Sequence, residues 1–128
     1  MKFHHLGVVC KDIQKELNIW QYLGYKQESD FFIDEIQKIK GVFLTAQNQP
    51  RIELLQNNNG EILNNLLRKK TKIYHYAYET NNIKQELLNL QKQKAIVICP
   101  IVKSSYFEQI CFVSLPNSLI IELVELKK

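Results

Sequence analysis

The sequence predicts an α+β fold made of two βαβββ modules in one chain of 128 residues. Three observations predict it. Residues 3–20 are repeated at residues 73–90 with a constant offset, which places His5 on His75 (75 − 5 = 70). Each copy begins with the alternating pattern of a strand and continues with apolar residues at helical spacing. Extended segments rich in β-branched residues follow each helix.

An Asx residue, Asp12 or Asn82, separates the first strand from the helix in each copy. Its side chain can accept hydrogen bonds from amides of the first helical turn. Apolar residues at i, i+4 and i+7 then form one stripe that suits packing on a sheet. The stripes are Ile13, Leu17 and Trp20 in the first copy and Ile83, Leu87 and Leu90 in the second. Gly24 predicts the end of the first helix.

The remaining strands follow the helices, and turn residues punctuate them. The expected strands are Tyr25–Phe32, Ile39–Ala46 and Arg51–Leu55 in the first half, and Ala95–Val102, Gln109–Leu115 and Leu119–Leu126 in the second. N-Q-P at 48–50 and P-N-S at 116–118 are turn sequences that precede the last strand of each half. Each half therefore reads as βαβββ.

The length suits one compact domain, since a chain of this size buries roughly two-thirds of its unfolded surface. We expect a single domain over residues 1–128, with module one at 1–56 and module two at 73–128. The connector at 57–72 contains a short predicted helix at Glu61–Leu67.

Composition argues against several classes of partner. No apolar run approaches the ~20 residues that span a bilayer, and the N-terminus lacks a signal-peptide pattern. We therefore expect a cytoplasmic protein without a membrane partner. The net charge of +4 is mild, and this argues against nucleic acid. The basic stretch 68–72 is interpreted as a solvated connector, or as a contact for a phosphate or carboxylate of a ligand.

The three cysteines, Cys10, Cys99 and Cys111, are odd in number and widely spaced. They predict neither a disulfide framework nor a thiolate zinc site. Each is expected to be a small buried apolar residue.

Each module has one His in its first strand and one Glu in its last. Strand alternation turns His5, Glu53, His75 and Glu122 away from the apolar residues that pack under the helices. A buried Glu is costly unless it is paired or binds a metal. The four side chains could neutralise each other as ion pairs or bind one divalent cation. We favour the cation because the positions are duplicated.

Five stretches carry a family resemblance. They are H-L-G-V-V at 5–9, Asp12-Ile13, R-I-E-L-L at 51–55, Y-H-Y-A-Y-E at 74–79 and P-N-S-L-I-I-E-L-V-E at 116–125. Together they resemble the vicinal oxygen chelate superfamily, which contains glyoxalase I, methylmalonyl-CoA epimerase, extradiol dioxygenases and bleomycin-resistance proteins. The resemblance covers essentially the whole chain. It implies the glyoxalase/bleomycin-resistance/dioxygenase fold, a curved mixed sheet around a metal-binding cleft.

The resemblance also implies a site. His5, Glu53, His75 and Glu122 would bind one divalent ion, such as Zn, Ni, Co or Mn, and the set is most similar to that of bacterial glyoxalase I. The implied activity is a lactoylglutathione lyase-like enzyme, a lyase or isomerase that moves a proton next to a carbonyl through a metal-stabilised enediolate or enolate. A ligand Glu would serve as base, with Glu122 as first candidate and Glu53 as second.

An alternative is an acyl-CoA epimerase similar to methylmalonyl-CoA epimerase, which the flanking sequence resembles at 41–45 and 72–80. Those epimerases commonly have Gln at the position of Glu53. They also have a catalytic Glu before a Gln, where the nearest match here is Ile36-Gln37. The implied substrate is a small molecule, either a thiohemiacetal or an acyl thioester, and the family often forms homodimers.

Three further hypotheses concern Arg51 and the function class. Arg51 shares the face of Glu53, so it is predicted either to contact a substrate anion or to form a rim salt bridge with Asp34 or Glu35. A non-catalytic, resistance-type binding protein is a second reading, although such members typically lack the metal ligands. An iron oxygenase needs two His, one carboxylate and open positions, which a second carboxylate ligand would crowd.

Overall fold

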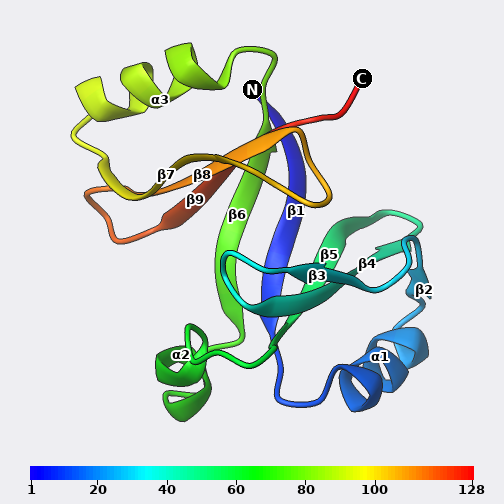
Figure 1. Ribbon diagram of the computed structural model, residues 1–128. Helices are drawn as coiled ribbons and strands as arrows, with labels where there is room; N and C mark the ends of the chain where they lie inside the picture. Colours follow the sequence, from blue (N-terminus) through cyan, green and yellow to red (C-terminus); the bar gives the residue numbers. More distant parts are fainter. The chain divides into compact units, whose positions relative to one another are not determined.

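The computed structural model describes residues 1–128 (Figure 1). The elements are β1 (Lys2–Val9), α1 (Ile13–Tyr22), β2 (Lys26–Gln27), β3 (Phe32–Asp34), β4 (Ile39–Ala46), β5 (Gln49–Asn57), α2 (Asn64–Arg68), β6 (Ile73–Glu79), α3 (Ile83–Lys92), β7 (Ile96–Lys103), β8 (Gln109–Ser114) and β9 (Ile120–Glu125). No helix has the length and apolar character needed to cross a bilayer.

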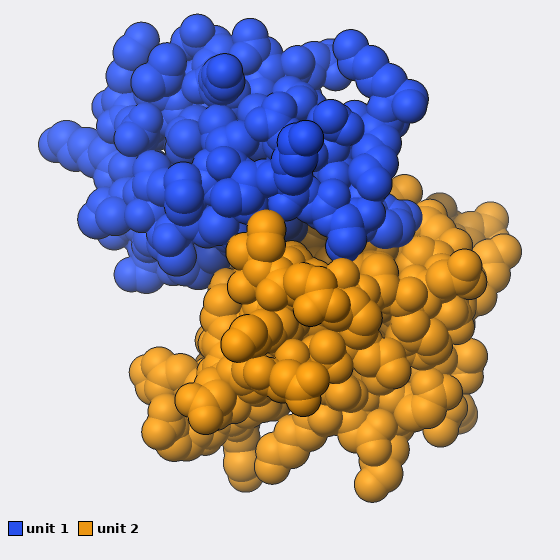
Figure 2. Space-filling view, in the orientation of Figure 1, with its two compact units in different colours: residues 1–4, 75–128 blue, residues 5–74 orange.

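The chain forms two compact units (Figure 2). The first-half unit is His5–Tyr74, and the second-half unit joins Met1–His4 to His75–Lys128. The connector thus belongs to the first-half unit, while the first four residues belong to the second.

In the first-half unit the strand order is β2-β4-β5-β1, with β3 on the other part of β4. β1 runs parallel to β5, so that Gly7 lies opposite Glu53. β4 runs antiparallel to β5 and pairs Phe43 with Glu53. The first and last strands of the module are therefore neighbours, as a βαβββ unit requires.

The second-half unit repeats this arrangement with the order β6-β9-β8-β7. β6 is parallel to β9 and places Ala77 opposite Glu122. β8 is antiparallel to β9 and pairs Phe112 with Glu122. The predicted duplication is confirmed at the level of strand register, because corresponding residues oppose each other in both halves.

One predicted strand is wrong. Tyr25–Phe32 was expected to be continuous, yet it contains only the two-residue β2, and β3 begins at Phe32. The amides of Glu28 and Ser29 both donate to the carbonyl of Phe43, at 2.8 and 3.4 Å. The Ser29 hydroxyl accepts from the Phe43 amide at 2.9 Å. Glu28 and Ser29 therefore both lie opposite Phe43, and this extra residue interrupts the strand pairing as a β-bulge does.

The predicted helix starts are confirmed. The Asp12 carboxylate accepts from the amides of Gln14 and Lys15, at 3.0 and 3.3 Å. Asn82 accepts from the Gln85 amide at 3.2 Å. α1 ends before Gly24, whose φ of +100° is the conformation that glycine tolerates best.

Each helix stripe packs on the apolar face of its own sheet, as predicted. The first core contains Val8, Cys10, Ile13, Leu17, Tyr25, Val42, Leu44, Ile52 and Leu54, with Trp20 against it. The second contains Ile83, Ala95, Cys111, Val113, Ile121 and Leu123, with Leu87 and Leu90 against it. These two cores lie under α1 and α3, and a further cluster of Val9, Ile39, Leu55 and Leu63 packs against Leu66 and Leu67. The His and Glu positions lie on the side of the strands opposite α1 and α3.

Candidate metal centre

The first half contains a buried His–Glu pair. Glu53 lies opposite Gly7, and His5 lies two residues before Gly7 on the same side of β1. His5 Nε2 is therefore 3.0 Å from Glu53 Oε1. The exposed fraction is 0% for His5 and 7% for Glu53. The parallel register thus joins residues that are 48 positions apart (53 − 5).

The second half contains the corresponding pair. Glu122 lies opposite Ala77, and His75 lies two residues before Ala77 on β6. His75 Nε2 is 3.1 Å from Glu122 Oε1. The exposed fraction is 2% for His75 and 6% for Glu122. All four predicted ligands are buried, and each half pairs its own His with its own Glu.

An aromatic ring covers each imidazole. The ring centroids of His5 and Phe43 lie 5.0 Å apart in an edge-to-face arrangement, and those of His75 and Phe112 lie 5.2 Å apart. The sequence pattern alone did not single out the two Phe residues. The available signal is spacing, because each precedes the pair's Glu by ten positions (53 − 43 and 122 − 112). The pairs are thus buried among aromatic rings, and burial strengthens electrostatic interactions.

The donor set fits a divalent ion. Imidazole nitrogen and carboxylate oxygen bind zinc at about 2.0–2.2 Å in a tetrahedral arrangement, which separates two ligand atoms by about 3.4 Å. The separations within the pairs, 3.0 and 3.1 Å, are a few tenths of an ångström shorter. An ion pair between imidazolium and carboxylate has the same separation. The His5, Glu53, His75 and Glu122 side chains form a buried group that could hold a metal ion.

Arg51 pairs with an acid other than the two expected. Its Nε donates to Glu28 Oε1 at 2.9 Å, and a second nitrogen lies 3.5 Å from Oε2. Asp34 is engaged elsewhere, because it accepts from the amides of Ile36 and Gln37 at 3.0 and 3.1 Å in the turn after β3. The ion pair with Glu28 was not predicted, since sequence spacing does not reveal which loop reaches β5.

The cysteines contribute no ligand to this group, in line with the sequence analysis. None of the three forms a disulfide. Burial raises the pKa of Cys10 to about 12, with a further contribution from the Glu16 carboxylate. Burial likewise raises the pKa of Cys111 to about 12. Cys99 is half-buried, so the expectation of burial is confirmed for two of the three.

With this geometry in view, comparison with known families decides the assignment. The family model of the Glyoxalase/Bleomycin resistance protein/Dioxygenase superfamily matches residues 4–124. The chain belongs to this superfamily. The resemblance drawn from the five sequence stretches is therefore confirmed, and so is the α+β fold class.

Solved structures of the same fold include epimerases. A hypothetical protein from Bacillus halodurans C-125 has a TM-score of 0.83 and 22% identity, over 99% of this chain and 95% of that one. Methylmalonyl-CoA epimerase from Mycobacterium tuberculosis has a TM-score of 0.83 and 19% identity, over 99% and 89%. Streptomyces coelicolor methylmalonyl-CoA epimerase in complex with 2-nitronate-propionyl-CoA has a TM-score of 0.79 and 16% identity, over 100% and 99%. At these identities the likeness concerns the fold. No curated protein sequence matches the chain.

Proposed function

We propose that this superfamily member is a divalent-metal-dependent isomerase that moves a proton at a carbon next to the carbonyl of an acyl thioester. One observation carries the proposal. Two buried His–Glu pairs occupy duplicated positions, with N–O separations of 3.0 and 3.1 Å. A chain that only needed a stable core would be at least as stable with apolar residues there, because buried ion pairs rarely outperform apolar packing.

In this proposal His5, Glu53, His75 and Glu122 together hold one ion. When bound, such an ion acts as a Lewis acid that stabilises negative charge on a carbonyl oxygen. Phe43 and Phe112, which pack on the two imidazoles, fix the orientation of these rings and keep water away from them. The protein thereby supplies a preorganised polar site in apolar surroundings.

The carboxylates would move the proton. Epimerisation removes a proton from one face of a carbon and returns it to the other, so two groups serve it better than one. Glu122 and Glu53 come from different halves of the chain and are the two candidates, with Glu122 as the first. Ile36, at the position matched to the family's catalytic Glu, is 64% exposed in the turn after β3 and cannot titrate.

Two observations support the acyl thioester class. Several solved structures of the same fold are methylmalonyl-CoA epimerases, and one of them is a complex with methylmalonyl-CoA and NH4+. The flanking sequence at 41–45 also resembles that group. The second candidate is a lactoylglutathione lyase-like activity on hemithioacetals, which is favoured by Glu rather than Gln at position 53.

The test begins with metal. Protein purified without chelator is expected to hold one divalent ion by elemental analysis, and His75→Ala is expected to lose it. His4→Ala is the matched control, because His4 is the remaining histidine and its ring packs on Phe107 instead. Unchanged metal content in His75→Ala would place the ion elsewhere.

Activity is then measured by NMR as exchange of the C2 proton for deuterium in 2-methyl-branched acyl-CoA thioesters, with Zn, Ni, Co or Mn added. Isomerisation of 2-oxoaldehyde hemithioacetals is measured in parallel. Exchange with the thioesters alone supports the proposal, and turnover of hemithioacetals alone supports the second candidate. Metal binding without either activity would refute both and favour a non-catalytic binding protein.

Three expectations from the sequence stay predictions. They are the homodimer, the cytoplasmic location and a substrate contact by Arg51. The last competes with the Glu28 ion pair, because an anion at Arg51 would have to share or replace the carboxylate at 2.9 Å.

A further inference from the structure

A pocket lies wholly within the first-half unit, apart from the candidate metal centre. It has a volume of about 610 Å³, which is within the range of about 300–1,000 Å³ that small-molecule sites occupy. The end of β1, the first turns of α1, α2 and the basic stretch 68–72 surround it. Val9 lies four residues after His5 on β1, which is about 13 Å along a strand. The pocket is thus a separate feature from the His–Glu pair.

The floor and walls of this pocket are apolar. Val9 and Cys10 are buried, while Leu66 and Leu67 are half-buried and line it from α2. Ile19 lines it from α1 and keeps 57% of its surface exposed. Cys10 is chemically inert here, because its thiol stays protonated at neutral pH and points to the Leu55 carbonyl at 3.5 Å. The pocket therefore offers an apolar surface without a nucleophile.

Four lysines surround the opening, namely Lys11, Lys15, Lys70 and Lys72. The two acids beside them are already engaged. The Asp12 carboxylate accepts from two amides of α1. Glu16 is held by Lys72 at 2.6 Å and by the Trp20 indole at 2.9 Å. The ammonium groups of Lys11, Lys15 and Lys70 have no acid within ion-pair distance, so an unneutralised positive charge faces the pocket.

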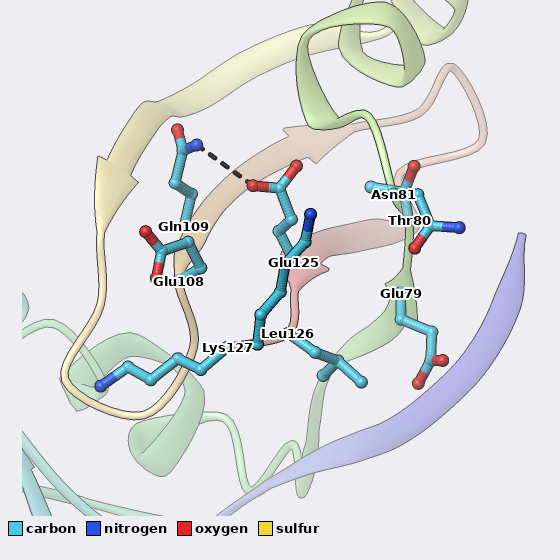
Figure 3. A pocket seen from close by; sticks show the side chains of 9 residues that line it. Glu79, Thr80, Asn81, Glu108, Gln109, Glu125, Leu126 and Lys127 are labelled. Carbon is cyan, nitrogen blue, oxygen red and sulfur yellow. Dashed lines mark hydrogen bonds between the residues drawn. The ribbon is translucent and has the colours of Figure 1, made fainter.

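The corresponding pocket of the second half has a different lining, so the fold does not require an apolar floor with lysines around it. Its matching pocket has a volume of about 480 Å³ and is lined by Met1, Lys2, Glu79, Thr80, Asn81, Asn82 and Glu86. At the offset of 70, Val9 corresponds to Glu79, Cys10 to Thr80 and Lys11 to Asn81. Figure 3 shows that these three residues also line another pocket of this half, together with the carboxylates of Glu108 and Glu125. The second-half pocket has one lysine, Lys2, and two carboxylates, so the apolar floor and the excess of lysines are features of the first half.

We propose that the first-half pocket binds a medium-chain fatty carboxylate, with its alkyl chain along Val9, Ile19 and Leu67 and its carboxylate between Lys15 and Lys70. Both parts of this ligand match the pocket. An alkyl chain gains free energy from covering exposed apolar surface. A monoanion complements the net positive charge of the lining, in which four lysines outnumber the carboxylates of Asp12 and Glu16. This also gives a role to Lys70 and Lys72 of the basic stretch, which the proposed isomerase does not use.

Isothermal titration calorimetry with octanoate, decanoate and dodecanoate tests the proposal on the full chain. Affinity is expected to rise by up to about tenfold for each added pair of methylenes. Dodecanol and dodecyltrimethylammonium are expected to bind at least about tenfold more weakly than dodecanoate. Dodecyl phosphate separates a carboxylate site from a general anion site: tighter binding of the phosphate would overturn the carboxylate assignment.

Variants locate the site. Lys15→Glu and Ile19→Glu are each expected to weaken dodecanoate binding by about tenfold. Lys15 lies in the first turn of α1, where a Glu suits the helix dipole, and Ile19 is 57% exposed, so folding should be retained in both variants. Lys84→Glu is the matched control, because it makes the same change of charge at an exposed position of α3. Equal weakening by Lys84→Glu would overturn the site and leave only a general charge effect.

Chemical shifts and metal removal complete the test. Dodecanoate is expected to shift the amide resonances of Cys10, Ile19 and Leu67, with or without EDTA. Shifts confined to residues outside the pocket, or binding that disappears with EDTA, would overturn the proposal. Because the readout is ligand binding in chelator, its failure is distinguishable from failure of the proposed isomerase activity.

Discussion

The two halves of the chain agree in their buried polar residues and differ at the N-terminal ends of their helices. Both halves place a His, a Glu and a Phe in the same register, with N–O separations of 3.0 and 3.1 Å. Yet Val9, Cys10 and Lys11 of one half correspond to Glu79, Thr80 and Asn81 of the other. The same strand pairing is therefore compatible with apolar and basic residues before one helix and with polar and acidic residues before the other. The shared fold therefore does not dictate the residues at the helix start, whereas the two His–Glu pairs recur in both halves.

The largest expected effect is a difference in kcat between variants of the two buried carboxylates, Glu122 and Glu53. Glu122→Gln is expected to lower kcat for C2 proton exchange by about 10²–10⁴-fold, which is the range for loss of a general base. Glu53→Gln is expected to lower it less, because the related epimerases commonly have Gln there. Rates are compared at saturating metal, with bound metal measured in each variant. Equal losses would show that the two halves contribute alike.

The second prediction tests whether the two aromatic contacts are equivalent. Phe43→Ala and Phe112→Ala are each expected to lower the free energy of unfolding by about 3–5 kcal/mol, because each removes a large buried side chain. Urea unfolding monitored by circular dichroism measures the change. Phe43→Leu and Phe112→Leu keep most of the volume and serve as milder controls. A loss below about 1 kcal/mol in either Ala variant would contradict the packing described for that half.

The third prediction compares the buried thiols of the two cores. The pKa of Cys10 and of Cys111 is raised to about 12 in the folded chain, from an ordinary value of 9.0. The contribution of each thiol to stability is thus complete below pH 9 and is lost as pH rises from about 9 to 12. At pH 10 the expected loss is on the order of 1 kcal/mol per thiol.

Urea unfolding at pH 8 and pH 10 measures this loss, and the Cys10→Ala, Cys111→Ala double variant is the control because tyrosines and lysines titrate in both proteins. The pH-dependent fall should be smaller in the double variant. A fall of the same size would show that the thiols do not cause it. In a thiol-labelling experiment at pH 8, Cys99 should react well before the two buried cysteines.

The smallest expected effect concerns the link between each last strand and its helix. Gln56 accepts from the Ile13 amide at 2.8 Å, and Glu125 accepts from the Ile83 amide at 3.3 Å. Gln56→Ala and Glu125→Ala are each expected to cost about 1 kcal/mol, as loss of a helix cap does. Thermal unfolding measures both. Gln14→Ala, on the exposed side of α1, should change stability by less than about 0.5 kcal/mol.

Much of the fold and of the candidate site follows from local sequence pattern. The Asx caps, the helix stripes and the strand phase depend on residues close together in the chain, and the structure has them where the pattern predicts them. The four His and Glu residues were also predictable, because strand alternation selects a face without knowledge of the partner strand. Because the sequence repeats, the same alternation predicts the facing residues in both halves.

The rest depended on pairing between distant segments, and only the tertiary structure decided it. The interruption of Tyr25–Phe32 arises where Ser29 meets Phe43, and the partner of Arg51 is set by the loop that carries Glu28. The Phe rings reach the imidazoles only through the register of a third strand. Register is set by hydrogen bonds and packing between strands, which no local periodicity encodes. The sequence by itself therefore determined which residues face the site, and the tertiary structure determined what they touch.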